Sequence, residues 1–181
     1  AHLRLVDFVL KNCDFDKILV IPAFKPPHKD YDIKMSFHRL NMCRIAFKNF
    51  DKVEVSDIEF QRGEKSYTYV TIRELYKKFE IEGKINFITG TDAFENIENW
   101  YEAEKLKKLV KFIVFKREEK FSALKYNHLK DRGYNFEIQT LDFENISSSN
   151  LRELIKNNES TINYLPSEIK EYIEKNDLYK S

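Results

Sequence analysis

Residues 85–92 read Ile-Asn-Phe-Ile-Thr-Gly-Thr-Asp, and this stretch indicates the fold class of the chain. The mostly apolar run 85–89 predicts a buried strand, and it ends at once in the polar cluster Gly90-Thr91-Asp92. The residues that follow have helical spacing and predict a short helix that carries Trp100. A buried strand followed directly by a helix is typical of one half of a β-α-β unit.

The same alternation extends outward in both directions. The other predicted strands are Lys17–Ala23, Val53–Phe60, Lys111–Lys116 and Asn135–Phe143. The other predicted helices are 2–13, Ser36–Phe50 with Ser36 as its N-cap, Thr68–Glu80, Tyr101–Val110, Asn150–Asn157 and Pro166–Lys175. Strands that alternate with helices predict an α/β fold: a doubly wound, mostly parallel sheet with helices on both faces.

The chain shows no internal repeat and no linker, so we expect residues 1–181 to form a single domain. The pattern opens on a helix at His2-Leu3 with no strand before it. Because an α/β domain of this kind normally begins with a strand, we expect that the first strand is missing and that the domain is truncated at its N-terminus.

Composition excludes several classes of protein. Charged residues make up 34% of the chain but nearly cancel, to a formal net charge of +1, so charge gives no reason to expect a nucleic-acid or membrane partner. Cys13 and Cys43 have neither metal-site nor disulfide-framework spacing, which suits a reducing compartment. With no signal peptide and no apolar run of about 20 residues, we expect a cytoplasmic protein. The sequence does not fix the oligomeric state.

Polar clusters follow several of the predicted strands. They are Pro26-Pro27-His28-Lys29, Gly90-Thr91-Asp92, Arg117 and Ser147–Arg152. In a doubly wound sheet, ligands bind beyond the carboxyl ends of the strands. The clusters therefore predict a single ligand-binding edge.

The cluster Ile146-Ser147-Ser148-Ser149-Asn150-Leu151-Arg152 stands where a strand gives way to a helix. A helix N-terminus presents unpaired N–H groups and a positive dipole end, and the serine hydroxyls add donors. Arg152 in the first turn supplies a cationic fork suited to phosphate oxygens. The cluster therefore predicts a polyphosphate cradle, although the serines also fit plain N-capping and the two roles are compatible.

Taken in order, these clusters resemble the nicotinate-nucleotide adenylyltransferase family of the nucleotidylyltransferase superfamily. The resemblance rests on His2-Leu3, Ile21-Pro22-Ala23, 26–29, Arg39, Met42, Ala46, Ser66-Tyr67-Thr68, Thr71, 90–92, Trp100, Arg117, 146–152, Leu165-Pro166, Tyr172-Ile173 and Leu178-Tyr179. There are departures: His2 matches the last histidine of the family's opening motif, Ala1 stands where glycine is usual, and Ser149 and Leu151 replace threonine and isoleucine.

The resemblance implies a Rossmann-like fold and a nucleotidyltransferase of NAD biosynthesis. Such an enzyme transfers the adenylyl group of ATP to nicotinate mononucleotide, giving deamido-NAD and pyrophosphate. Two alternatives stay open. The first is a superfamily relative that adenylylates phosphopantetheine, FMN or nicotinamide mononucleotide (NMN). Trp100 and Thr68 argue against this alternative. The family's sequences open with a glycine-rich strand-to-helix turn, which is absent here. The second alternative is therefore a nucleotide-binding protein without catalytic activity.

For the ATP half of the site, the resemblance implies His2, Lys29 and Arg152 as catalytic phosphate-binding residues. Ile146, Ser147, Ser148 and Ser149 join Arg152 in binding ATP. The nucleophile is already an anionic phosphate, so the residues expected are cations and N–H donors and not a general base. Mg²⁺ is expected to arrive with ATP, without dedicated protein ligands. The structural alternative for Lys29 is an ordinary solvated lysine on a turn.

For the mononucleotide half, the implied residues are Tyr67, Thr68, Gly90, Asp92, Trp100 and Arg117. The helix start at Thr68 is expected to hold the nicotinate carboxylate, and Trp100 to stack on the pyridine ring. Gly90 permits close backbone approach, Asp92 binds a ribose hydroxyl or helps hold Mg²⁺, and Arg117 binds the mononucleotide phosphate. The structural alternatives are an N-cap at Thr68 or Asp92, a core tryptophan and a solvated arginine.

Overall fold

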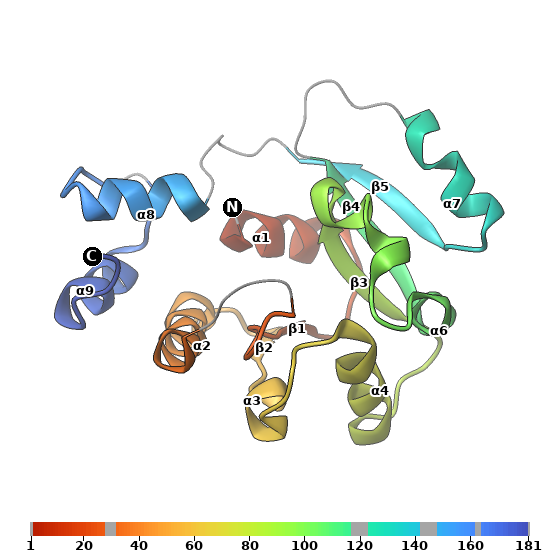
Figure 1. Cartoon of the computed structure of the whole chain (residues 1–181), viewed down its shortest axis with the longest axis horizontal. Helices are drawn as coiled ribbons and strands as arrows, with labels where there is room; N and C mark the ends of the chain where they lie inside the picture. The colour runs from red at the N-terminus through yellow and green to blue at the C-terminus, as the bar shows by residue number, and fades with distance from the viewer. Residues whose placement is uncertain (1, 28–31, 117–122, 142–147, 162–163, 181) are drawn as a thin grey trace. The chain divides into compact units, whose positions relative to one another are not determined.

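The computed structural model describes residues 2–27, 32–116, 123–141, 148–161 and 164–180 (Figure 1). The chain divides into two compact units. Unit 1 comprises residues 1–25, 29–64 and 143–181, and unit 2 comprises residues 26–28 and 65–142. The expectation of a single domain stays a prediction.

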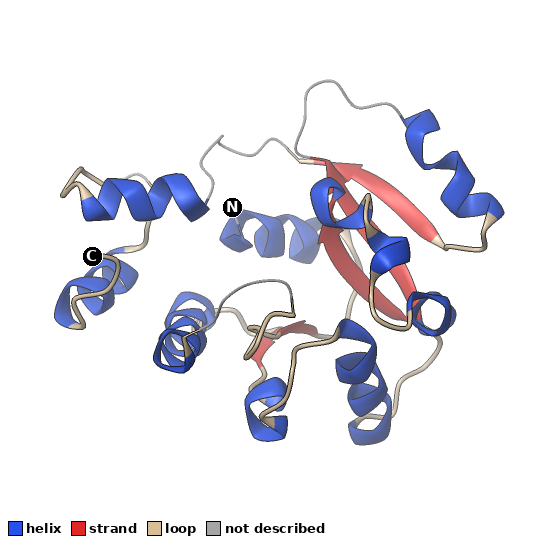
Figure 2. Cartoon of the chain, in the orientation of Figure 1, coloured by secondary structure: helices blue, strands red, loops and turns tan. Residues whose placement is uncertain are grey.

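Unit 1 consists of a two-stranded sheet and of helices from both ends of the chain (Figure 2). Its elements are α1 (His2–Asn12), β1 (Ile18–Val20), α2 (Ile33–Phe47), β2 (Val53–Val55), α3 (Ile58–Arg62), α8 (Ser148–Lys156) and α9 (Ser167–Lys175). β1 and β2 pair in parallel, with Ile18 opposite Val53 and Val20 opposite Val55.

The C-terminal part of unit 1 has its own apolar cluster. Ile169, Ile173 and Leu178 are each 5% exposed and form its centre. Met42 of α2 and Ile155 of α8 pack against them, so this cluster joins α2, α8 and α9. Figure 1 shows α9 between α8 and α2. Both C-terminal helices are amphipathic; α9 buries Ile169 and Ile173 in the apolar cluster, and α8 contributes the partly buried Ile155.

Unit 2 is a three-stranded parallel sheet with short helices. Its elements are α4 (Thr68–Lys78), β3 (Ile85–Gly90), α5 (Thr91–Phe94), the 3₁₀ helix η1 (Ile97–Asn99), α6 (Ala103–Leu109), β4 (Val110–Lys116), the 3₁₀ helix η2 (Ala123–Tyr126), α7 (Asn127–Asp131) and β5 (Phe136–Thr140). The strand order is β3-β4-β5, and both pairings are parallel.

The sheet of unit 2 is stabilised by burial of the apolar side chains of its central strand, β4. Its residues 112–115 are at most 1% exposed, as the unbroken apolar run in the sequence predicts for a strand covered on both faces. Phe112 pairs with Phe87 of β3 and Phe136 of β5 in the register, so three phenylalanines cross the sheet side by side. Phe94 of α5 packs on Phe112 and Phe136, at centroid distances of 5.3 and 5.0 Å.

All the strand pairings that the structure describes are parallel, which confirms the predicted α/β class with a mostly parallel arrangement. None of the described helices is long and apolar enough to cross a membrane. Most predicted elements are present with ends displaced by a few residues.

One predicted strand is wrong in its second half. The expected strand Val53–Phe60 ends at Val55, and α3 begins at Ile58. The Ser56 hydroxyl accepts a hydrogen bond from the Ile58 N–H at 3.4 Å. Gly63 ends the helix in the left-handed conformation, with φ at 73°. A hydroxyl near the helix start and a glycine after the last turn are helix-boundary signals that the apolar alternation concealed.

The predicted N-cap of the second helix is also wrong. α2 begins at Ile33, and the carboxylate of Asp32 caps it by accepting the Lys34 N–H at 2.8 Å. Ser36 therefore lies within the first turns of the helix, fully buried. Its hydroxyl has a different partner, described below.

Candidate functional site

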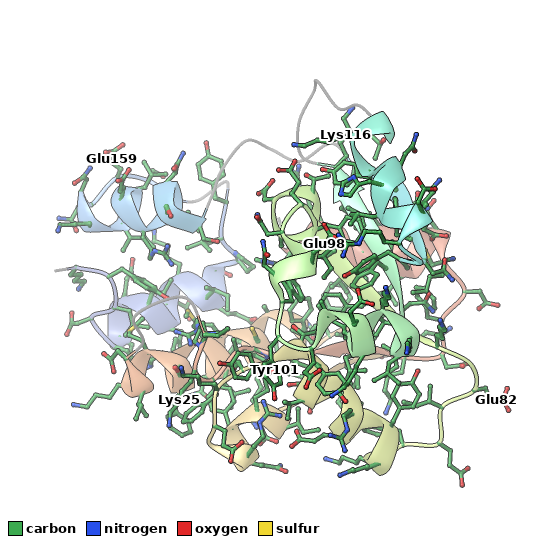
Figure 3. All side chains as sticks on the ribbon, turned by 45° about the vertical axis from the view of Figure 1, so that its right-hand side comes forward. Lys25, Glu82, Glu98, Tyr101, Lys116 and Glu159 are labelled. Carbon is green, nitrogen blue, oxygen red and sulfur yellow. The ribbon has the colours of Figure 1, made fainter. Side chains whose placement is uncertain are left out.

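The carboxyl end of the unit 2 sheet carries the predicted polar cluster. Gly90 ends β3 level with Phe115 of β4, so residues 90–92 leave the sheet beside Lys116, the last residue of β4 (labelled in Figure 3). Gly90 has an ordinary φ of −88°, so backbone conformation does not require a glycine here. Thr91 is 2% exposed, whereas Asp92 is exposed. Of this pair, only Asp92 has a solvent-exposed side chain.

The start of α4 provides N–H groups close to aromatic rings. Tyr67 is the N-cap residue and makes no side-chain capping bond, and Thr68 is the first helical residue. Thr68 is therefore not the N-cap, and the first turn keeps N–H groups without intrahelical partners. The Tyr67 ring lies 4.5 Å from the ring of Tyr101, which directly follows Trp100 in the chain.

Trp100 is half-buried and follows η1. Its ring meets Phe87 of β3 edge to face, with a centroid distance of 5.9 Å and an interplanar angle of 89°. The ring therefore packs on the sheet three residues before Gly90 while keeping part of its surface accessible. Through Tyr67–Tyr101 and Trp100–Phe87, unit 2 connects the start of α4, Trp100 and the middle of β3.

Unit 1 holds the described residues of the ATP half. His2 is the first residue of α1, and Ser148 and Ser149 form the first turn of α8. All three are exposed, as is Arg152. The Arg152 Nη2 donates to the Ser149 Oγ at 3.3 Å within the helix, so the cation and one serine of the predicted cradle lie in contact.

Tyr179 lies beside this cradle, and sequence reasoning gave it no role. Its ring packs against the Ile169–Ile173–Leu178 cluster, which also receives Ile155, one turn after Arg152. Burial raises the pKa of the Tyr179 phenol, and the nearby charges of Arg152 and Arg39 partly offset this rise. The backbone of Tyr179 has a φ of 65°, which is uncommon for a residue other than glycine. No pattern in the sequence indicates this conformation.

Four predicted residues lie outside the described ranges. They are Lys29, Arg117, Ile146 and Ser147. Their proposed roles stay predictions.

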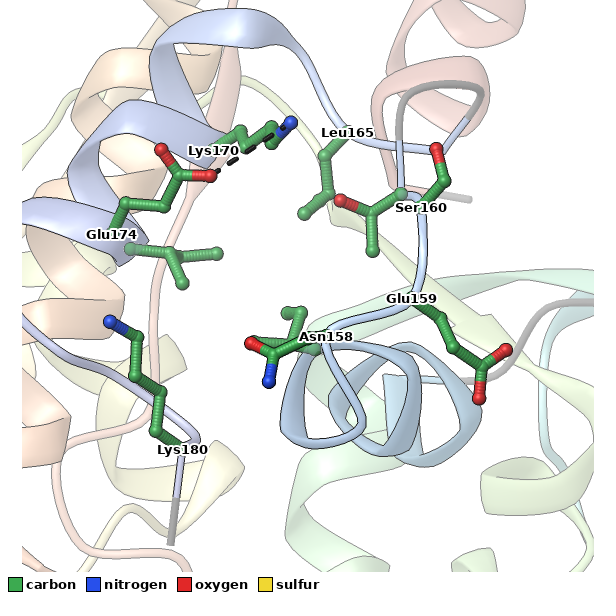
Figure 4. Close-up of a pocket in the computed structure, with 10 residues that line it drawn as sticks. Asn158, Glu159, Ser160, Leu165, Lys170, Glu174 and Lys180 are labelled. Carbon is green, nitrogen blue, oxygen red and sulfur yellow. Dashed lines mark ion pairs between the residues drawn. The ribbon is translucent and has the colours of Figure 1, made fainter.

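A pocket of about 300 Å³ lies between the end of α8 and the C-terminal turn of unit 1 (Figure 4). Its lining includes Lys170 and Lys180, but none of the predicted site residues. Lys170 pairs with Glu174 at 3.8 Å, and Lys180 pairs with Asp177 at 2.6 Å. Both cations are therefore already partnered by carboxylates, which makes this pocket a poor match for a polyphosphate.

Metal binding by side chains alone has no candidate among the described residues, because no group of three or more His, Cys, Asp or Glu side chains is arranged to hold an ion. Among the described residues, the ATP half offers hydroxyls, an imidazole and a guanidinium, whereas Mg²⁺ prefers carboxylate, carbonyl and water oxygens.

The geometry is that of a nucleotide-binding α/β fold, and comparison with known proteins decides the family. The cytidylyltransferase-like family model matches residues 1–154. A probable nicotinate-nucleotide adenylyltransferase of Fusobacterium nucleatum is 38% identical over 176 residues, covering 97% of this chain and 90% of the relative. The chain belongs to the nicotinate-nucleotide adenylyltransferase family. A probable nicotinate-nucleotide adenylyltransferase of Aliarcobacter butzleri is 34% identical, covering 96% of this chain and 87% of its own length.

Solved structures support the same fold for this adenylyltransferase family member. The nicotinic acid mononucleotide adenylyltransferase of Plasmodium falciparum complexed with NaAD superimposes with a TM-score of 0.76 at 22% identity, covering 98% of this chain and 89% of that one. The same enzyme complexed with APC gives a TM-score of 0.70. The predicted Rossmann-like fold is thereby confirmed.

Proposed function

We propose that this protein transfers the adenylyl group of ATP to nicotinate mononucleotide, giving deamido-NAD and pyrophosphate in NAD biosynthesis. The observation that carries the proposal is the match to nicotinate-nucleotide adenylyltransferases over nearly the whole chain. The described residues suit the two substrates: hydroxyls and a guanidinium for phosphate in unit 1, and aromatic rings beside the N–H groups of a helix start for a pyridine carboxylate in unit 2.

The chemistry makes modest demands on the protein. A phosphate oxygen of the mononucleotide attacks the α-phosphorus of ATP, a new P–O bond forms, and the bond to pyrophosphate breaks. The nucleophile is already ionised, so rate acceleration comes from alignment and from stabilising the charge on the departing pyrophosphate.

In this proposal the ATP half supplies that charge stabilisation. Arg152 offers its guanidinium to the β- and γ-phosphates, and Ser148 and Ser149 add hydroxyls at the positive end of α8. His2 and Lys29 donate to phosphate oxygens. Mg²⁺, entering on ATP with phosphate and water ligands, neutralises part of the triphosphate charge.

The mononucleotide half sets which acceptor is used. The first-turn N–H groups of α4 at Thr68 hold the nicotinate carboxylate, and Trp100 stacks on the pyridine ring. Asp92 accepts a hydrogen bond from a ribose hydroxyl, Gly90 lets the ligand approach the backbone, and Arg117 binds the mononucleotide phosphate. Tyr67 packs beside the carboxylate site through its contact with Tyr101.

We also propose a cytoplasmic location, because Cys13 and Cys43 are both free thiols. Deamido-NAD synthesis consumes ATP, which that compartment provides.

The test is a pyrophosphate-release assay on the protein expressed from its complete reading frame. Parallel reactions contain ATP and Mg²⁺ with nicotinate mononucleotide, NMN, phosphopantetheine or FMN. Release is expected to depend on a pyridine mononucleotide and to be fastest with the nicotinate form. Release with phosphopantetheine or FMN alone would support the wider superfamily alternative, and ATP binding without any release would support a non-catalytic binding protein.

A further inference from the structure

Side chains hold the backbone at Ala23 and Phe24, a few residues after β1. The Arg39 Nη2 donates to the Ala23 carbonyl at 2.9 Å, and the Ser36 hydroxyl donates to the Phe24 carbonyl at 2.7 Å. The Phe24 N–H donates to the Glu59 carboxylate at 3.3 Å. Three backbone groups in two consecutive residues thus have side-chain partners from α2 and α3.

Two of these partners are buried and the third, Arg39, is half-buried. Ser36 is fully buried and Glu59 is 6% exposed. Ser36 and Arg39 stand three residues apart on one face of α2, and the Arg39 Nη2 also donates to the Ser36 Oγ at 2.9 Å. Burying polar groups is costly unless each is bonded, and a segment that merely connected β1 to α2 could use water instead. The arrangement therefore fixes this segment more firmly than chain connection alone requires.

The segment lies where ligand-binding groups are expected. It follows the carboxyl end of a parallel strand, which is the ligand edge in this class of fold. Lys25, labelled in Figure 3, donates its Nζ to the Gly63 carbonyl at 2.9 Å, so a third consecutive residue is anchored. Pro26 and Pro27 come next and restrict the backbone further, and Lys29 follows two residues later in the sequence.

We propose that Arg39, acting with Ser36 and Glu59, is a positioning residue that fixes residues 23–25 so that the segment after β1 meets the triphosphate of ATP in one geometry. The proposal rests on the proposed function and assigns a role to an arginine that the family resemblance includes but leaves without one. Misplacement of reacting groups by about 1 Å can cost 100-fold in rate, so loosening this anchor is expected to impair catalysis.

The test compares Arg39→Gln with Arg39→Lys, and uses Arg44→Gln as the matched control. Arg44 lies on the same helix, but its half-exposed guanidinium pairs with Asp57 at 3.0 Å and leaves residues 23–25 untouched. Each variant is assayed for pyrophosphate release, for ATP binding by calorimetry and for amide hydrogen exchange, well below its melting temperature.

Arg39→Gln is expected to speed exchange in residues 23–25, to leave exchange in the middle of α2 unchanged, and to lower kcat/KM for ATP about tenfold. Arg39→Lys should recover part of this, since an ammonium can still reach one carbonyl. Arg44→Gln should match the wild type. Unchanged exchange in residues 23–25, or faster exchange with unchanged kcat/KM, would overturn the proposal.

Failure of the proposed function and misfolding of Arg39→Gln can each be told apart from failure of the anchor proposal. If the wild-type protein releases no pyrophosphate, the proposed function fails, and ATP binding becomes the criterion: weaker binding by Arg39→Gln supports the anchor, and equal binding overturns it. If Arg39→Gln does not fold, Ser36→Ala replaces it, because that variant removes only the hydroxyl that holds the Phe24 carbonyl.

Discussion

The two units carry candidate site residues of different chemistry. In unit 1, the described phosphate-binding candidates stand exposed at helix starts, on α1 and α8. In unit 2, Gly90 and Asp92 lie at the carboxyl end of β3, in a sheet whose central strand is almost fully buried, and Trp100 packs on Phe87 of the same strand. Phosphate is recognised by charge and N–H groups, which tolerate solvent, whereas a flat ring needs a shaped surface built on a rigid core.

The largest effect is expected in the exposed, charge-based half. Arg152→Ala removes a cation proposed to stabilise the departing pyrophosphate, so kcat/KM for ATP should fall about 100-fold or more. Because Arg152 is exposed, the melting temperature should barely change. Lys156→Ala, in the last turn of the same helix, is the control and should retain activity. A loss of less than threefold with Arg152→Ala would remove it from the catalytic set.

The next effect tests the ring-based half. Trp100→Ala should raise KM for nicotinate mononucleotide about 10- to 100-fold, because stacking of a base on an aromatic ring contributes about 1–3 kcal/mol. KM for ATP should stay within about twofold of the wild type. Trp100→Phe, which keeps an aromatic face beside Phe87, should recover much of the loss. Equal weakening of both substrates with intact folding would show that Trp100 serves only the core.

A subtler change isolates the N–H groups of α4. Proline is tolerated at the first position of a helix, and Tyr67 before it already has an extended backbone, so Thr68→Pro should fold while removing one N–H. The preference for nicotinate over nicotinamide mononucleotide, measured as a ratio of kcat/KM values, should fall about tenfold. Thr68→Ala keeps the N–H and should keep the preference. An unchanged ratio in the proline variant would exclude this N–H from acid recognition.

These comparisons also show what the sequence could and could not predict about the site. Residues 148–152 and 90–92 were predictable because each lies at a strand end or a helix start, which local patterns reveal. Tyr179 and the Arg39–Ser36–Glu59 set were not, because their partners are far away in the sequence. For the same reason Ser36 looked like an N-cap, whereas its hydroxyl bonds the carbonyl of Phe24, twelve residues before it.

The smallest expected effect concerns alkaline pH. The Tyr179 pKa is raised in the folded protein, mainly by burial, so folding favours the protonated phenol. Its contribution to stability is complete below the ordinary phenol pKa of about 10 and is lost as pH rises through the raised value. Urea unfolding at pH 8 and pH 10.5 should show a steeper loss of stability in the wild type than in Tyr179→Phe. Identical pH dependence in the two proteins would show that Tyr179 does not titrate differently on folding.

By itself, the sequence determined the α/β class, the parallel strands and the family. An apolar run such as 112–115 is typical of a strand covered on both faces, and the polar clusters at strand ends are local patterns in the sequence. The tertiary structure alone decided which side chains hold the backbone after β1. That outcome depends on hydrogen bonds between residues distant in sequence, such as Phe24 with Glu59, and no local pattern encodes such pairs.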